Sequence, residues 1–267
     1  IIYMDFGLDC AMLPARLLPW LDLFGTIITE IGTDTKDYMQ FARELGMYTG
    51  GFSNSFNTYT RLGDTGEGCR PMAWFHLKAL SSFLDRALSL AGEVFRSVSF
   101  ANRRRIKEIV LREFAWDEHS VQSEGYPLAA SRVFAHLSLA GQYNEYVNGA
   151  TSYLRLKELA QDYDRLEEDF LRDLEEMRDL LFRREALLLS ITGSGADVSS
   201  FARRAGAVVD CLAPGVVSAV APEFTPFAPN QGLCTSAEVV YNVQGCRLFT
   251  EPRQYNGNFE VLKTWIS

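Results

Sequence analysis

The chain has 267 residues, of which 47% are hydrophobic and 22% are charged, and its formal net charge is −8 with a pI of about 5.0. This composition is typical of a folded protein with a sizeable core, and the acidic balance argues against a nucleic-acid-binding surface. No apolar run reaches the roughly 18 residues that span a bilayer, because Asp22 and Thr26 interrupt the best candidate. We therefore expect neither nucleic acid nor membrane as a partner.

Cysteine usage indicates a reducing compartment. The five cysteines are scattered and form no C-x-x-C pair, so neither a disulfide framework nor a zinc site is indicated. We expect a cytoplasmic protein, with an organelle matrix as the alternative in a eukaryote. The chain begins without Met and lacks a basic signal-peptide region, which favours a piece of a longer polypeptide.

The first 50 residues predict one strand and two helices. Residues 2–9 alternate between apolar and polar, which is typical of a half-buried strand. The stretch 17–31 is apolar nearly all round, which predicts a buried helix that ends at Gly32. Asp34 or Thr35 is expected to cap the next helix, whose apolar residues recur at 3-4-3 spacing and therefore give it one packed face.

A double glycine separates these helices from two further strands. Gly50-Gly51 is expected to turn the chain into a strand over 52–60. Residues 72–81 alternate again and predict a second strand. A helix with one apolar stripe follows over 84–98 and is expected to lie across the sheet.

Residues 101–182 are expected to form an almost wholly helical excursion. Asn102 can cap its first helix, and the basic cluster 103–105 in that helix is more typical of a solvated helix face than of a phosphate-binding site. A second helix is expected over 128–139, with Gly141 as its breaker.

The last part of the excursion predicts its longest helix. Leucine and aromatic residues recur at 3-4 spacing from Leu156 to Leu181. A coiled-coil seam has the same spacing, but one helix face packed on a domain is the favoured interpretation.

The final third of the chain returns to the sheet and then becomes irregular. A short apolar run predicts a strand over 185–192, and a helix follows over 197–212. Four prolines in 213–229 indicate a linker, with a strand expected over 237–243 and the start of a helix over 256–266.

The predicted fold class is α+β, with a mostly antiparallel mixed sheet, helices packed on one face and a long helical insertion. Three parts are expected along the chain. Residues 1–212 form the α+β domain, 213–235 form a Pro-rich linker, and 236–267 are the truncated start of a following domain.

Several long runs carry a family resemblance: FGLDCAMLPARLLPWLDLFGTIITEIGT, DYMQFARELGMYTGG, HLKALSSFLDRALSLAGEVF and ANRRRIKEIVLREFAWDEHSVQSEGYPLAASRV. In order and spacing they resemble the C-terminal half of presequence proteases, which are members of the pitrilysin or insulin-degrading (inverzincin) superfamily of zinc peptidases. The resemblance covers most of the chain. It implies a zinc-less copy of the superfamily's α+β domain and a place in a zinc metalloendopeptidase.

The zinc chemistry of that superfamily is missing from this sequence. Its catalytic members hold zinc with H-x-x-E-H on a helix, but the three histidines of this chain lack partners at that spacing. The resemblance places the ligand positions near Leu23, Thr26 and Ile27, which bind zinc poorly. We therefore expect no catalytic residue, no metal ligand and no cofactor in this chain; zinc is bound elsewhere in the full-length enzyme.

The remaining polar residues offer two candidate sites. Asp117, Glu118, His119 and Glu124 point in different directions on a helix, which favours a solvated acidic patch over a metal site. No Ser-His-Asp or Cys-His arrangement has a local signature. The other candidate is a chamber-lining, peptide-contacting strand, against the simpler alternative of an ordinary sheet strand; its residues are Gly50, Gly51, Phe52, Ser53, Asn54 and Ser55.

Three functions remain open at this point. The first is a non-catalytic, chamber-forming segment of a zinc endopeptidase that degrades unfolded peptides or presequences in a closed clamshell cavity. Its partners are the zinc-bearing N-terminal half of the same polypeptide and peptide substrates. The second is a zinc-less structural or peptide-binding subunit of the same superfamily, and the third is an unrelated α+β interaction module. An H-x-x-E-H motif upstream in the gene would separate the first from the second. Self-association through 237–250 is also expected.

Overall fold

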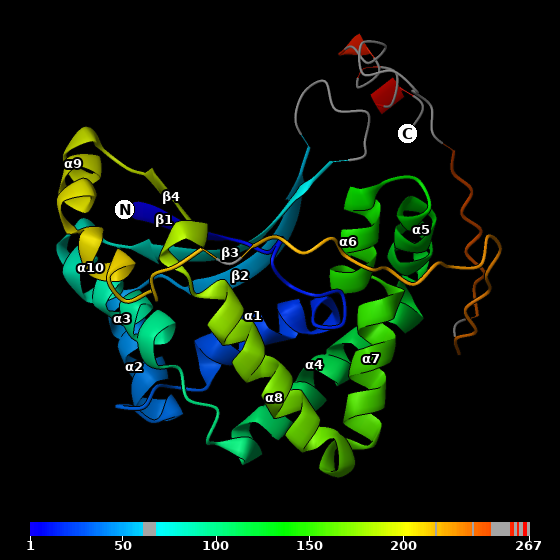
Figure 1. Cartoon of the computed structure of the whole chain (residues 1–267), viewed down its shortest axis with the longest axis horizontal. Helices are drawn as coiled ribbons and strands as arrows, with labels where there is room; N and C mark the ends of the chain where they lie inside the picture. The colour runs from blue at the N-terminus through cyan, green and yellow to red at the C-terminus, as the bar shows by residue number, and fades with distance from the viewer. Residues whose placement is uncertain are drawn as a thin grey trace.

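The computed structural model describes residues 1–60, 68–216, 218–236, 238–246, 257–258, 261 and 264–265. Within them the chain forms a four-stranded sheet in the order β2-β3-β1-β4 (Figure 1). The strands are β1 (Ile2–Asp9), β2 (Phe52–Tyr59), β3 (Arg70–Ala79) and β4 (Leu187–Thr192). All three pairings are antiparallel, so the predicted α+β class and the four predicted strands are confirmed.

The two faces of the sheet differ as the alternation predicts. Met4 and Phe6 of β1 and Phe75 of β3 lie on one face and are almost completely buried. Phe95 of α3 (Leu84–Ser97) contacts both aromatic rings edge-on, with centroid distances of 5.6 and 5.8 Å. In Figure 1 the helices α1, α3, α4 and α8 lie on this side of the strands. The core therefore forms between one sheet face and the helical layer, as expected.

The apolar segment after β1 forms a short 3-10 turn (Leu18–Trp20) and then α1 (Leu21–Glu30). Gly32, at φ 96°, reverses the chain, and a Cβ there would lie 2.6 Å from the carbonyl oxygen of Lys36. The cap of α2 (Tyr38–Tyr48) is Asp37, not Asp34 or Thr35 as expected. Its carboxylate accepts from the backbone N–H groups of Met39 and Gln40, because the turn after Gly32 is longer than the sequence suggested.

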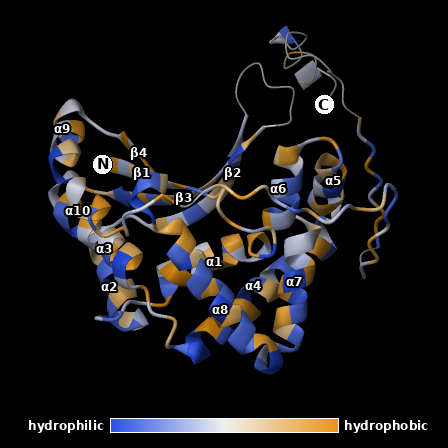
Figure 2. Ribbon diagram, viewed as in Figure 1, coloured by the Kyte–Doolittle hydropathy of each residue, from blue (hydrophilic) through white to orange (hydrophobic). Residues whose placement is uncertain are grey.

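The helical excursion is confirmed, but it contains more helices than expected. They are α4 (Arg103–Ser123), α5 (Tyr126–Ala135), α6 (Leu139–Asn148), α7 (Ala150–Gln161) and α8 (Tyr163–Leu181). The predicted long helix is divided at Asp162, whose φ and ψ of −132° and 40° leave the helical region. The 3-4 spacing continues across this single residue, so periodicity could not reveal the break. Figure 2 shows both hydrophilic and hydrophobic residues along α7 and α8.

Gly141 does not end a helix, as the sequence suggests, but lies inside α6. A Cβ at this position would lie 2.0 Å from the carbonyl oxygen of Phe134 in α5. The glycine therefore permits α5 and α6 to approach closely, and the chain breaks earlier, at Leu137 and Ser138.

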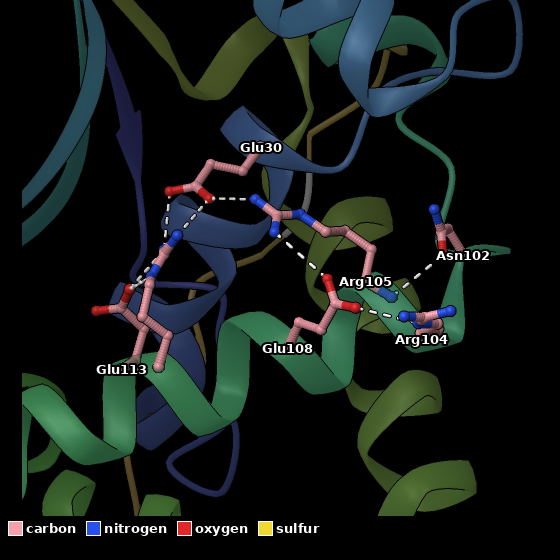
Figure 3. Close-up of polar contacts among 7 residues, drawn as sticks. Glu30, Asn102, Arg104, Arg105, Glu108 and Glu113 are labelled. Carbon is pink, nitrogen blue, oxygen red and sulfur yellow. Dashed lines mark hydrogen bonds and ion pairs between the residues drawn. The ribbon is translucent and has the colours of Figure 1, made fainter.

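An ion network joins α4 to α1 (Figure 3). Glu30, at the end of α1, receives both terminal nitrogens of Arg112 at 2.7 and 2.8 Å and one from Arg105 at 3.0 Å. Asn102 caps α4 by accepting from the backbone N–H of Arg105 at 3.1 Å, as predicted. The whole basic cluster is paired with carboxylates, which agrees with a helix face and not a phosphate site; the partners are Glu167 and Glu168 for Arg103, Glu108 for Arg104, and Glu30 and Glu108 for Arg105.

After β4 the chain forms α9 (Gly195–Arg204) and α10 (Gly206–Val209), dividing the single helix expected over 197–212. The Pro-rich segment then docks on the excursion. Phe224 contacts the rings of Tyr143 and Tyr146, and the Arg132 guanidinium lies 4.0 Å from the centre of the Phe227 ring. This segment is therefore anchored through its aromatic residues.

The expected strand over 237–243 does not form in residues 238–243; Ala237 lies outside the described residues. The Tyr241 hydroxyl instead donates to the carbonyl oxygen of Ser123 at 3.2 Å, and Gly245 approaches Val133 of α5. Packing of this segment back on the sheet, one of the expected outcomes, is therefore wrong for 238–246. Of the expected final helix, the described Asn258, Val261, Thr264 and Trp265 are helical.

Candidate functional site

The sheet face that points away from the helices is polar and open to solvent. Tyr3 and Asp5 of β1, His76 and Lys78 of β3, and Ser53 of β2 lie on it, because paired residues of neighbouring strands share a face. Tyr3 is 46% exposed and the His76 side chain 42%. Chemistry-bearing side chains from three strands therefore meet on one accessible surface.

Strand β2 borders this face and is an edge of the sheet. At its start, the N–H of Gly50 donates to the Lys78 carbonyl oxygen at 2.6 Å, and the N–H of Lys78 donates to the Gly51 carbonyl oxygen at 3.2 Å. Gly51 has φ 134°, which an L side chain rarely adopts. The two glycines opposite one lysine form a bulge that starts the strand.

The bulge sets which backbone groups of β2 face outward. Because Gly51 is hydrogen-bonded to Lys78, antiparallel alternation directs the backbone groups of Ser53 and Ser55 toward β3. The N–H and C=O groups of Phe52, Asn54 and Phe56 then point toward the outer edge. No other described strand pairs with that edge, so it offers free backbone donors and acceptors.

The predicted site residues divide between the two faces. Ser53 and Ser55 lie on the open face, whereas the Phe52 ring packs against Phe75 on the core side, with centroids 6.2 Å apart. The Asn54 amide donates to the Asp22 carboxylate at 3.0 Å and fills the space above Gly25 of α1. Half of the candidate strand therefore anchors β2 to α1, and the other half is available to a ligand.

A hydrogen-bonded Ser–His–Asp array lies at the centre of the open face. Ser55 Oγ is 2.8 Å from His76 Nε2, and His76 Nδ1 is 2.8 Å from Asp5 Oδ1. Since an ionised carboxylate only accepts, Nδ1 carries the proton and the neutral ring accepts from the Ser55 hydroxyl. Sequence reasoning missed the array because its members come from β2, β3 and β1; the alternation that places His76 opposite the core was the only signal.

Trp74 and Gly7 shape the floor beside the array. They face each other across β3 and β1, and a Cβ on Gly7 would lie 2.7 Å from the indole ring. The ring therefore lies flat over β1 and leaves Asp5 and His76 uncovered.

The positions that match zinc ligands in the resemblance do not form a metal site. Leu23 and Ile27 are buried in the core, and the carbonyl oxygen of Thr26 accepts from the Thr29 hydroxyl. Across the described part of the chain, no group of three or more His, Cys, Asp or Glu residues is placed to hold a metal ion. Asp117 of the acidic patch instead lies near Asp22 and Glu113. In the same described part, no helix is both long and apolar enough to cross a bilayer.

Comparisons with known proteins agree with this architecture. The chain is 24% identical over 262 residues to "Protein HypA" of Clostridium perfringens, covering 98% of this chain and 27% of that protein. It is 27% identical over 212 residues to "Presequence protease 1, chloroplastic/mitochondrial" of Arabidopsis thaliana, covering 79% and 19%. The chain thus spans about a quarter or less of the curated relatives it matches.

A solved protease from Helicobacter pylori has a similar fold, with a TM-score of 0.52 at 12% identity over 83% of this chain and 47% of that one. Residues 1–159 match the family described as peptidase M16, subfamily C, associated, which is more than half of the chain. These matches confirm the resemblance to presequence proteases found in the sequence. The chain belongs to this family of peptidase-associated domains.

Proposed function

We propose that this chain is a segment of the chamber wall of a zinc endopeptidase, in which the zinc-bearing N-terminal half of the same polypeptide cuts unfolded peptides. The observation that carries the proposal is an open polar sheet face bordered by an unpaired edge strand. Membership of a peptidase-associated family and the name "presequence protease" of several relatives support the reaction class. The absence of H-x-x-E-H from this sequence supports cleavage elsewhere.

The peptide-contacting element is β2. An extended peptide can add to a sheet edge through main-chain hydrogen bonds, which accept any sequence. The outward backbone groups of Phe52, Asn54 and Phe56 supply these bonds, and the exposed Ser53 adds a polar contact on the open face. Such recognition suits an enzyme that degrades many different unfolded peptides.

The cofactor and the compartment follow from the same proposal. Zinc is held by the other half of the polypeptide, and the acidic segment described above binds neither nucleic acid nor membrane. All five cysteines are free thiols, which supports a reducing compartment, either the cytoplasm or an organelle matrix.

Peptide cross-linking in the full-length protein tests the role of β2. A photoreactive residue in place of Ser53 should cross-link to an unstructured substrate peptide, whereas the same residue in place of Glu175, exposed on α8, should not. Unlabelled peptide should compete with the cross-link. Cleavage that proceeds without cross-links at Ser53, or with equal cross-links at Glu175, would exclude β2 as the contact.

A further inference from the structure

We propose that the Ser55–His76–Asp5 array makes Ser55 an activated nucleophile, so that the open face carries a second reactive site for acylating electrophiles such as activated esters. The site is independent of zinc and of edge-strand pairing. It therefore goes beyond the chamber-wall function and is tested separately.

The array has the connectivity that activates a serine. A base must lie within hydrogen-bond reach of the nucleophile, and a third group must orient the base. Both contacts measure 2.8 Å, and the Asp5 carboxylate selects the His76 tautomer whose free Nε2 faces Ser55. Asp5 acts through His76 and is a positioning residue.

The surroundings leave the serine oxygen available. The Ser55 proton is directed to His76, and the Asn57 amide donates to Oγ at a long 3.4 Å. The backbone groups of Ser55 are directed to β3, so they do not cover the open face. The half-exposed His76 ring borders solvent, which gives a small electrophile a path to the hydroxyl.

The covalent step balances without a co-reactant. Ser55 Oγ attacks the carbonyl carbon of an activated ester while its proton passes to His76 Nε2, and Asp5 stabilises the resulting imidazolium. The tetrahedral adduct expels the alcohol oxygen, which takes the proton from His76, and leaves an acyl-Ser55. Water can then repeat the sequence and release the carboxylic acid.

The array lacks a preorganised oxyanion hole among the described residues. Serine hydrolases stabilise the tetrahedral oxyanion with two or more fixed N–H donors, and each donor is worth on the order of 100-fold in rate. Here the N–H donor described at Ser55 Oγ is the flexible side-chain amide of Asn57. We therefore expect stoichiometric acylation followed by slow deacylation, in contrast to rapid turnover.

The experiment uses a biotinylated fluorophosphonate on the full-length protein with zinc removed by chelation, followed by peptide mass analysis. The probe loses fluoride to Ser55 Oγ and should label Ser55. Ser55→Ala should abolish this label. Ser53→Ala is the matched control, since Ser53 lies on the same strand and face, and it should keep the label.

The role of the base is tested with His76→Ala. Labelling should fall on the order of 100-fold, the usual contribution of a general base, and added imidazole should restore part of it. Asp5→Asn should also slow labelling, and Asp5→Glu should recover more than Asn does. A merely structural role would not respond to imidazole.

Several results would overturn the proposal: no label on Ser55 in folded protein, equal labelling of Ser53, or labelling unaffected by His76→Ala. Thermal melting of each variant identifies loss of fold. Because peptide cross-linking at Ser53 reads the chamber-wall function by itself, either proposal can fail while the other stands.

Discussion

Asp117 shows how one side chain connects the fold to pH. Burial raises its pKa to about 6, and the nearby carboxylates of Asp22 and Glu113 contribute in the same direction. The unfolded chain releases this proton near pH 4. Between these values the folded state holds the proton and the unfolded state does not, so the contribution of Asp117 to stability falls as pH rises and is lowest above pH 6.

Asp117→Asn should therefore raise the melting temperature at pH 7.5 and lose that advantage toward pH 4. After discounting for solvent screening of this partly exposed group, we expect a gain on the order of 1 kcal/mol. Thermal unfolding of both proteins across this pH range is the measurement. Glu175→Gln on α8 is the control and should show little pH dependence. An advantage of Asp117→Asn that is equal at pH 4 and pH 7.5 would contradict the assignment.

A buried ion pair between α5 and α6 is a second feature at this scale. Glu145 is fully buried, pairs with Arg132 at 3.0 Å and accepts from the backbone N–H of Thr151 at 2.9 Å. Because Arg132 also lies over the Phe227 ring, the pair links the hairpin to the docked Pro-rich segment.

At the scale of elements, the α5–α6 hairpin depends on a close backbone approach. Gly141→Ala should destabilise the protein by about 2–3 kcal/mol, because the new Cβ meets the rigid carbonyl group of Phe134. Gly46→Ala is the matched control: Gly46 also lies within a helix, α2, but a Cβ there meets nothing within 4 Å.

Chemical denaturation of both variants measures this difference. Gly46→Ala should gain about 0.5–1 kcal/mol from helix propensity. If Gly141→Ala is no less stable than Gly46→Ala, the helices do not need the close approach. A changed denaturant slope would instead indicate that the compactness of a state had altered.

At the scale of the whole molecule, the sheet has a covered face and an open one, and the C-terminal segment leaves the domain. Val239 and Val240 are 59% and 82% exposed in this segment, which has no strand in its described residues. Apolar side chains in water favour association, so self-association through 237–250 remains our prediction; Ala237 and 247–250 lie outside the described residues.

Sedimentation of the isolated chain tests this association. Val239→Ser with Val240→Ser should shift a dimer to monomer, while Val220→Ser, a substitution of an exposed valine in the anchored segment, should not. A monomer before any substitution would end the dimer proposal. In that case the contacts of Tyr241 and Gly245 with α4 and α5 would be the only described packing of this segment.

Local periodicity determined most of the architecture. Strand alternation in β1 and β3 and the stripe of α8 follow from which residues must be buried, and this requirement is visible within a few residues of sequence. Asn102 as a cap and Gly50-Gly51 as a strand start are equally local, because each satisfies or permits backbone geometry at its own position.

Only the tertiary structure decided the rest. The break at Asp162 and the cap at Asp37 depend on one residue's backbone conformation, which leaves the hydrophobic spacing unchanged. Gly141 acts through a contact with another helix. The Ser55–His76–Asp5 array depends on the register of three strands, since a slip of one residue would move each side chain to the other face. Register is set by the packing of the whole sheet, so no local pattern contains it.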